Sequence, residues 1–285
     1  MQPFEPSELP ESILSTLIAA DGRTLAVQDW MQHSAVRGVV VLVHGLGEHS
    51  GRYEALAGQL NSWGFAVRGY DQHGHGLSHG VRGSLPSETT LLDDLADVID
   101  DARSHMAAEL PLILLGHSMG GLVAAQFVRL GIRPVDALVL SSPALDAGLG
   151  LFQKLLLKVL PNLAPNFRVG NGLNPYLISH DPKVVEAYLA DRLVHDRISA
   201  RMGAFIANGG AQVIAAAPAW QVPTLLLYAG SDHLVNPQGS QRFAAAAPQS
   251  VVTAVRFDDL YHELFNELEP TEVLATLRQW LDARY

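Results

Sequence analysis

One stretch of the sequence reads PLILLGHSMGGLVAAQF, covers residues 111–127, and changes character at a serine. The residues up to Gly116 form an unbroken apolar run, which is typical of a strand covered on both faces of a parallel sheet. The residues after Ser118 have the apolar spacing of a helix. A serine at so sharp a turn needs a strained backbone, and Gly116 and Gly120 remove the side chains that would collide there. This G-x-S-x-G pattern predicts that Ser118 is a nucleophile, with an ordinary glycine-rich turn as the alternative.

Strands and helices alternate on both sides of this stretch. Short apolar or β-branched runs predict strands at 38–43, 65–70, 111–116, 135–141, 223–230 and 251–257. Helical spacing predicts helices at 52–63, 89–109, 119–130, 237–247 and 270–284. Near the start, two β-compatible runs at 12–20 and 25–31 are joined by Asp21-Gly22, which is a hairpin signal. The repeated order of strand and helix predicts an α/β fold on a mostly parallel, doubly wound sheet.

The alternation is interrupted between residues 143 and 219, where leucine-rich stretches such as 149–160 have helical spacing. Three prolines punctuate this segment: Pro161, Pro165 and Pro175. We expect a helical cap (lid) insertion at 143–219 over the carboxyl ends of the strands, with 1–142 and 220–285 forming the core. The leucines could line an acyl pocket, since each buried methylene contributes about 0.8 kcal/mol. They could also form only the cap's own core, or contact a lipid surface.

A glycine-flanked turn, HGLG at residues 44–47, follows the predicted strand at 38–43 directly. A serine nucleophile needs two backbone N–H groups that bind the oxyanion, and the residue after the serine, Met119, supplies one. The glycines let this turn come close to the nucleophile, so Leu46 is the predicted second donor. A phosphate-binding turn is the alternative, although a third matching glycine is missing.

A serine hydroxyl also needs a base, which should be a histidine oriented by a carboxylate. In a fold of this kind the chain order is serine, acid, histidine. Asp232 follows the predicted strand at 223–230, and His262 lies in the loop after the last predicted strand, so these two are the predicted acid and base. The alternatives are Asp258 or Asp259 as the acid, and His233 as the base.

The composition excludes several classes of function. The chain has 285 residues, a formal net charge of -10 and no cysteine. A negative chain lacks the basic stripe that binds nucleic acid, and the absence of cysteine excludes disulfides and a thiolate nucleophile. The N-terminal residues lack the pattern of a secretory signal, and no apolar run reaches the roughly 18 residues that a membrane-spanning helix requires. We therefore expect a cytoplasmic protein.

Three closely spaced histidines, at 73, 75 and 79, look at first like a metal site. Histidine is a common zinc ligand, but no cysteine and no distant histidine-rich loop completes the set. The glycines among them indicate a tight loop whose histidines form hydrogen bonds. We expect no metal and no other cofactor.

Three blocks together resemble the monoacylglycerol lipase and lysophospholipase group of the α/β-hydrolase superfamily: HGLGEHSGRY (44–53), YDQHGHGLS (70–78) and GHSMGG (116–121). The resemblance extends from about residue 23 to residue 281. It implies an α/β-hydrolase fold with an eight-stranded core and a lid, and hydrolysis of a glyceride or lysolipid ester.

The resemblance also implies roles for single residues. Ser118, Asp232 and His262 form the catalytic triad in this interpretation, and Leu46 and Met119 give the oxyanion N–H groups. Three further residues match positions that hold the glycerol head group, with local loop structure as the alternative: Glu48, Arg52 and His117.

These residues together predict a serine hydrolase that cleaves carboxylic esters through an acyl-enzyme, as a monoacylglycerol lipase or carboxylesterase. Its partner is then a small lipid or ester molecule and not a nucleic acid, with transient contact between the cap and a lipid surface left open. The alternatives are a lysophospholipase, a serine aminopeptidase or amidase with an acidic pocket, and a catalytically inactive binding protein on the same fold. Ser118 argues against the enzymes of this fold that use an aspartate nucleophile.

Overall fold

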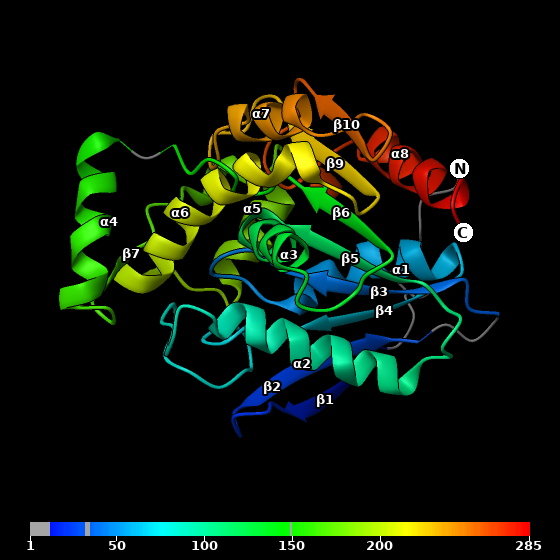
Figure 1. Cartoon of the computed structure of the whole chain (residues 1–285), viewed down its shortest axis with the longest axis horizontal. Coiled ribbons are helices and arrows are strands. Elements are labelled where there is room, and N and C mark those ends of the chain that lie inside the picture. The colour runs from blue at the N-terminus through cyan, green and yellow to red at the C-terminus, as the bar shows by residue number, and fades with distance from the viewer. Residues whose placement is uncertain (1–11, 32–34, 149) are drawn as a thin grey trace.

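The computed structural model describes residues 12–31, 35–148 and 150–285. An eight-stranded sheet forms its centre, in the order β1-β2-β4-β3-β5-β6-β9-β10 (Figure 1). Its strands are β1 Ser12–Ile18, β2 Thr24–Trp30, β3 Gly38–Val43, β4 Phe65–Tyr70, β5 Leu112–His117, β6 Ala137–Ser141, β9 Thr224–Ala229 and β10 Val252–Phe257. β2 is antiparallel to both β1 and β4, whereas all other neighbouring strands are parallel. The predicted mostly parallel sheet is confirmed.

The central strand β5 shows why the apolar runs become buried strands. Every residue of β5 is buried, and successive side chains of a strand point to opposite faces of the sheet. Leu112 and Leu114 enter the hydrophobic core on one face, while Ile113 and Leu115 enter the core on the other face. A strand between two cores has no polar face, which is why its sequence does not alternate.

Helices cover both faces of the sheet (Figure 1). One core contains residues of α2 Thr90–His105, α3 Ser118–Leu130 and α7 Gln238–Ala246, and the other contains residues of α1 Glu54–Ser62 and α8 Thr271–Asp282. Two short 3-10 helices, η2 Ser50–Tyr53 and η5 Leu264–Asn266, precede α1 and α8. α2 ends before the predicted boundary at 109, because Met106 is extended and the amide of Leu110 donates to the carbonyl of Ala107 in a turn.

The predicted hairpin at Asp21-Gly22 is confirmed. Gly22 has a φ of 83°, a left-handed conformation that glycine adopts without a steric penalty. β1 and β2 pair from Ser12 opposite Trp30 to Ile18 opposite Thr24.

The segment between β6 and β9 contains α4 Leu151–Leu163, β7 Arg168–Gly170, η3 Pro175–Leu177, α5 Pro182–Ala190, β8 Arg197–Ser199, α6 Ala200–Ala216 and η4 Ala217–Ala219. β7 and β8 pair antiparallel, and the prediction of a helical insertion did not include this short two-stranded sheet. Pro161 lies inside α4 and does not end it. α4 stands away from the sheet, whereas α6 passes close to α3 and contributes Met202 and Val213 to the core (Figure 1). Across the described residues, every helix is too short or too polar to cross a membrane.

Candidate active site

Ser118 lies at the junction of β5 and α3, where the strand turns into the helix. Its φ is 53°, a left-handed conformation that few residues other than glycine adopt. A Cβ atom on Gly116 would lie 2.5 Å from the carbonyl oxygen of Gly120, and one on Gly120 would collide with the carbonyl oxygen of Val43. Both glycines are therefore required where β3, β5 and α3 meet. The strained turn predicted around the serine is present.

His262 and Asp232 form a buried pair at the carboxyl ends of β10 and β9. The Nδ1 atom of His262 lies 2.7 Å from Oδ2 of Asp232, and the two side chains are 6% and 1% exposed. Oδ1 of Asp232 accepts hydrogen bonds from the amides of Leu234 and Val235, at 2.9 and 3.0 Å. Asp232 can therefore hold one tautomer of the imidazole, with Nε2 left to act on a proton.

Charge and burial act in opposite directions on this pair. Burial lowers the pKa of His262, but the adjacent Asp232 carboxylate outweighs it, and the pKa lies above the ordinary value. Burial raises the pKa of Asp232, and the charge and hydrogen bond of His262 bring it below the ordinary value. The carboxylate thus favours the charged imidazole, which is the form that a base acquires during the reaction.

Ser118 and His262 line the same small cavity of about 20 Å³, together with Leu46. The alternative acids lie elsewhere, since Asp258 is 75% exposed and pairs with Arg256 on the surface, and Asp259 is exposed. The alternative base, His233, has its ring packed against Tyr261.

The predicted oxyanion donors flank this serine. Leu46 lies in the turn after β3, and a Cβ atom on Gly45 would lie 3.3 Å from Cβ of Ser118, so the turn comes very close to the nucleophile. Met119 is in the first turn of α3, where backbone N–H groups have no partner within the helix. Gly47 has a φ of 80°, and the carbonyl oxygen of His195 fills the space where a side chain would stand.

Glu48 and Arg52 line the small cavity, but their charged groups bind other protein atoms. Glu48 accepts hydrogen bonds from the amide of Gly45 at 2.6 Å, from the hydroxyl of Tyr53 at 2.7 Å, and from Arg52. Burial would raise the pKa of Glu48, but the charge of Arg52 contributes most to lowering it, to about 2. Arg52 also donates to both carboxylate oxygens of Glu263, at 2.8 and 2.9 Å. These contacts favour the local structural role that the sequence left open for the two residues.

His117, the third predicted head-group residue, is buried beside the base. Its ring centroid lies 4.7 Å from that of His262, and its Nδ1 lies 3.2 Å from the hydroxyl oxygen of Ser141. Burial, reinforced by the positive charge of His262, lowers its pKa to about 3. His117 is therefore neutral in the site at neutral pH.

An apolar cavity of about 330 Å³ opens next to the serine. Ser118, Met119 and Leu46 are among the residues that line it. The segment between β6 and β9 provides most of its apolar wall: Leu156, Leu157, Leu160, Phe167, Val169, Ile198, Gly203 and Ile206. A hydrocarbon chain in this cavity would therefore lie next to the nucleophile.

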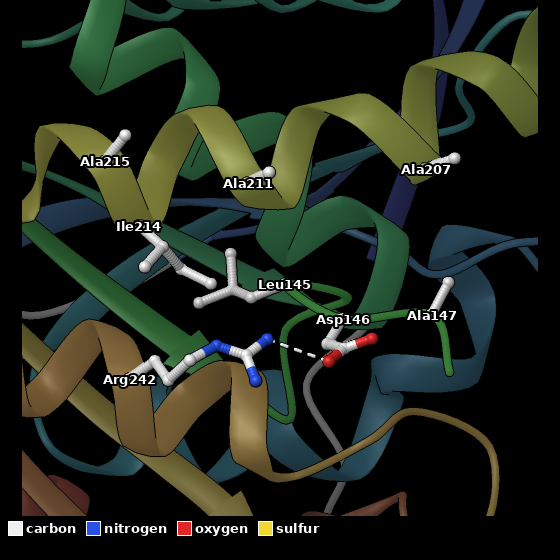
Figure 2. Close-up of a pocket in the computed structure, with 8 residues that line it drawn as sticks. All are labelled: Leu145, Asp146, Ala147, Ala207, Ala211, Ile214, Ala215 and Arg242. Carbon is white, nitrogen blue, oxygen red and sulfur yellow. Dashed lines mark hydrogen bonds and ion pairs between the residues drawn. The ribbon is translucent and has the colours of Figure 1, made fainter. Parts of the chain in front are cut away.

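A third hollow, of about 300 Å³, lies between α6 and α7 (Figure 2). Alanines of α6 form one side, and Arg242 of α7 points across it to Asp146, with Nη2 and Oδ2 2.8 Å apart (Figure 2). None of the predicted site residues lines this hollow. Ala147 lines both this hollow and the apolar cavity.

The loop with the three histidines is packed against the oxyanion turn. The ring of His75 lies 5.2 Å from that of His44 and 4.8 Å from that of His195. Among the residues that the structure describes, no three His, Cys, Asp or Glu side chains are arranged to hold a metal ion.

Sequence reasoning missed the contacts that brace the site from the inserted segment. The guanidinium of Arg52 lies 4.7 Å from the ring centre of Tyr188 on α5, and the amide of His195 donates to the carbonyl of Gly47. Glu263 directly follows the predicted base in the sequence, but its contact with Arg52 was not predicted. Tyr188 and His195 carry no signal that a single sequence could reveal.

The chain is similar to several known proteins along most of its length. Residues 34–269 match the family described as Serine aminopeptidase, S33. The chain is 34% identical over 255 residues to a monoacylglycerol lipase of Mycolicibacterium smegmatis, covering 88% of this chain and 90% of that protein. It is 33% identical to an uncharacterised abhydrolase domain-containing protein of Dictyostelium discoideum over 96% of this chain, but it spans only 29% of that protein's length. The crystal structure of a Paleococcus ferrophilus monoacylglycerol lipase superposes with a TM-score of 0.81 at 34% identity, covering 92% of this chain and 99% of that one.

Proposed function

We propose, from the premise that this chain belongs to the Serine aminopeptidase, S33 family, that it is a serine ester hydrolase whose preferred substrate is a monoacylglycerol. The family shares the α/β-hydrolase fold, which is also that of the solved monoacylglycerol lipase. The family's description and the names of these relatives point to different substrates, so the site itself has to favour one of them.

One observation carries the proposal: His262, which is paired with the buried Asp232 side chain, lines a cavity together with the strained Ser118, and the same serine also lines an apolar cavity. A hydroxyl, a base and a fixed carboxylate form the chemical unit of acyl transfer. The apolar cavity provides a place for the acyl group of the substrate. A catalytically inactive binding protein would not need all three of these groups, the hydroxyl, the base and the carboxylate.

The reaction then proceeds in two halves. Ser118 attacks the ester carbonyl while His262 accepts its proton, and Asp232 stabilises the imidazolium. The N–H groups of Leu46 and Met119 bind the oxyanion, and removal of one such donor costs about 3 kcal/mol. His262 protonates the leaving alcohol, and water then repeats these steps on the acyl-enzyme. No cofactor takes part in this scheme.

The hydrogen bonds of the carboxylates near the serine favour an ester over a peptide with a free amine. An aminopeptidase needs a carboxylate that can bind the substrate's ammonium group. Glu48 and Glu263, which line the small cavity, are both bound to Arg52. Arg52 offsets only one of these two negative charges, but each of the four carboxylate oxygens already accepts a hydrogen bond from the protein, with which a substrate ammonium group would have to compete.

The size of the apolar cavity favours an acyl chain of medium length. An apolar cavity of about 150 Å³ holds one benzene molecule, so this cavity of about 330 Å³ takes roughly twelve carbon atoms.

The segment 143–219 acts in this proposal as a cap that also meets lipid surfaces. Leu163 at its α4 end is 78% exposed, and Phe167 is 57% exposed. Leu156 and Val159 on the same helix are also exposed. Exposed apolar side chains around the wall of a substrate cavity provide a surface that insoluble lipid can contact. The predicted cytoplasmic location stays a prediction, which cell fractionation can test.

A hydrolysis panel tests the proposed function. Monoacylglycerols, lysophospholipids, p-nitrophenyl esters and aminoacyl amides of matched concentration should give the highest kcat/KM with a monoacylglycerol. A higher kcat/KM with the lysophospholipid would show that the enzyme is a lysophospholipase. Activity confined to amides would refute the ester assignment.

A further inference from the structure

A short segment of the insertion, residues 178–180, lies against the loop that carries His262. The carbonyl of Ile178 accepts a hydrogen bond from the amide of Glu263 at 2.8 Å. The hydroxyl of Ser179 donates to the carbonyl of Asn266, also at 2.8 Å. Ile178 and Ser179 are both buried. We call residues 178–180 the strap.

The strap also contacts this loop through His180, which binds Glu267. One carboxylate oxygen of Glu267 accepts from the amide of His180 at 3.1 Å, and the other lies 2.9 Å from its Nδ1. The second oxygen also accepts from the amide of Tyr261 at 2.7 Å. The Glu267 side chain is 2% exposed and that of His180 is 38% exposed, so the carboxylate that accepts these bonds is shielded from water. Hydrogen bonds to a carboxylate are stronger than those between neutral groups.

The ring of His180 adds a stacking contact on the same loop. It lies on the ring of Tyr261, with centroids 3.6 Å apart and planes at 27°. Both backbone neighbours of His262 are therefore fixed by hydrogen bonds: the amide of Tyr261 to Glu267, and the amide of Glu263 to the strap. A base that bridges a carboxylate and a serine needs such a fixed backbone, because small displacements of reacting groups cost much rate.

We propose that Glu267 and His180 are positioning residues that hold the His262 loop against the inserted segment, so that the imidazole stays between Asp232 and Ser118. This inference rests on the proposed function, because it assigns these residues to the base of that reaction. Neither residue touches the reacting atoms. In this inference the insertion has two roles: it covers the substrate, and its strap fixes the loop that carries the base.

The pH profile separates positioning from a purely structural role. The titratable groups that face His262 are Asp232, His117, Glu263 and Glu48. The contact with Asp232 raises the pKa of His262. If the loop loosens, this contact weakens, so the acid limb of the kcat/KM profile should move to lower pH. A change in folding alone would reduce the active fraction without moving that limb.

The test compares Glu267→Ala with the matched control Glu269→Ala, which removes an exposed carboxylate from the same loop. Active sites are counted with a fluorophosphonate, and kcat and KM are measured with one ester. Glu267→Ala should lower kcat per active site by about tenfold to a hundredfold with little change in KM, and should shift the acid limb to lower pH. The control should match the wild type.

Two substitutions at His180 keep the inference testable if Glu267→Ala does not fold. His180→Asn keeps a donor near the position of Nδ1 and should retain most of kcat. His180→Phe keeps the ring on Tyr261 but loses the donor, and should lower kcat and shift the acid limb. Normal kcat and an unmoved acid limb in folded Glu267→Ala or His180→Phe, with an active wild type, would overturn the inference. A wild type that cleaves no ester would instead refute the proposed function.

Discussion

Arg52 binds Glu263 through two hydrogen bonds, although 211 residues separate them in the sequence. The same guanidinium binds Glu48, in the turn that carries the predicted oxyanion donor Leu46. It also faces the ring of Tyr188 from the inserted segment. One buried cation therefore connects the oxyanion turn, the loop of the base and the insertion.

Replacing Arg52 with methionine should destabilise the protein and lower activity toward every ester. Removal of one partner from a buried ion pair leaves an uncompensated charge and costs about 3–5 kcal/mol. Urea unfolding should show this loss, whereas Arg278→Met, at a half-exposed surface pair with Asp282, should cost less than about 1 kcal/mol.

The same variant decides between the two roles considered for Arg52. A monoacylglycerol and a p-nitrophenyl ester of the same acid should lose kcat/KM in parallel, because the loops move in both cases. A loss restricted to the glycerol ester would show that Arg52 binds the head group.

Activity should rise with pH along an acid limb whose midpoint lies above 6.5, the ordinary pKa of histidine. Only the neutral imidazole of His262 can accept the serine proton, and Asp232 raises the pKa at which this form appears. The measurement is the pH dependence of kcat/KM with an ester that does not ionise. A midpoint below 6.5 would contradict the described pair.

Asp232→Asn should lower kcat by about ten-thousandfold, because the amide holds the wrong tautomer of the imidazole. Asp258→Asn is the matched control, since Asp258 follows the neighbouring strand but lies on the surface. Equal losses in the two variants, measured by steady-state hydrolysis, would mean that the acid has been assigned wrongly.

Gly203→Val should shorten the acyl chain that the enzyme accepts. Gly203 lines the apolar cavity, and a Cβ atom there would lie 3.1 Å from Cδ2 of Leu157. Exclusion of two methylenes from the cavity costs about 1.6 kcal/mol, or roughly tenfold in kcat/KM for a dodecanoyl ester. The kcat/KM of Gly203→Val for an acetyl ester should be unchanged. The control is Asn208→Val, at an exposed position of the same helix, which should hydrolyse both esters like the wild type. An equal loss for both chain lengths would rule out this role.

Much of the fold could be predicted because its signals are local. The turn around Ser118 needs Gly116 and Gly120, the hairpin needs Gly22, and buried strands such as β5 require continuous apolar runs. Each of these constraints acts within a few residues and is therefore visible in a single sequence.

The rest depends on contacts between distant parts of the chain. β7 and β8 have three residues each, too few to give a pattern, and they form only by pairing with each other. The strap residue His180 and its partner Glu267 are 87 positions apart. Glu48 and Arg52 were identified from the sequence, but their charged groups bind partners that only the folded chain brings together.

Fluorophosphonate labelling followed by peptide mass spectrometry tests the central assignment most directly. The wild type should take up one phosphonate per chain, on the peptide that contains Ser118, and should lose ester hydrolysis in proportion. Ser118→Ala should neither label there nor hydrolyse esters. A folded wild type that resists the reagent, or a Ser118→Ala variant that still hydrolyses esters, would contradict the account.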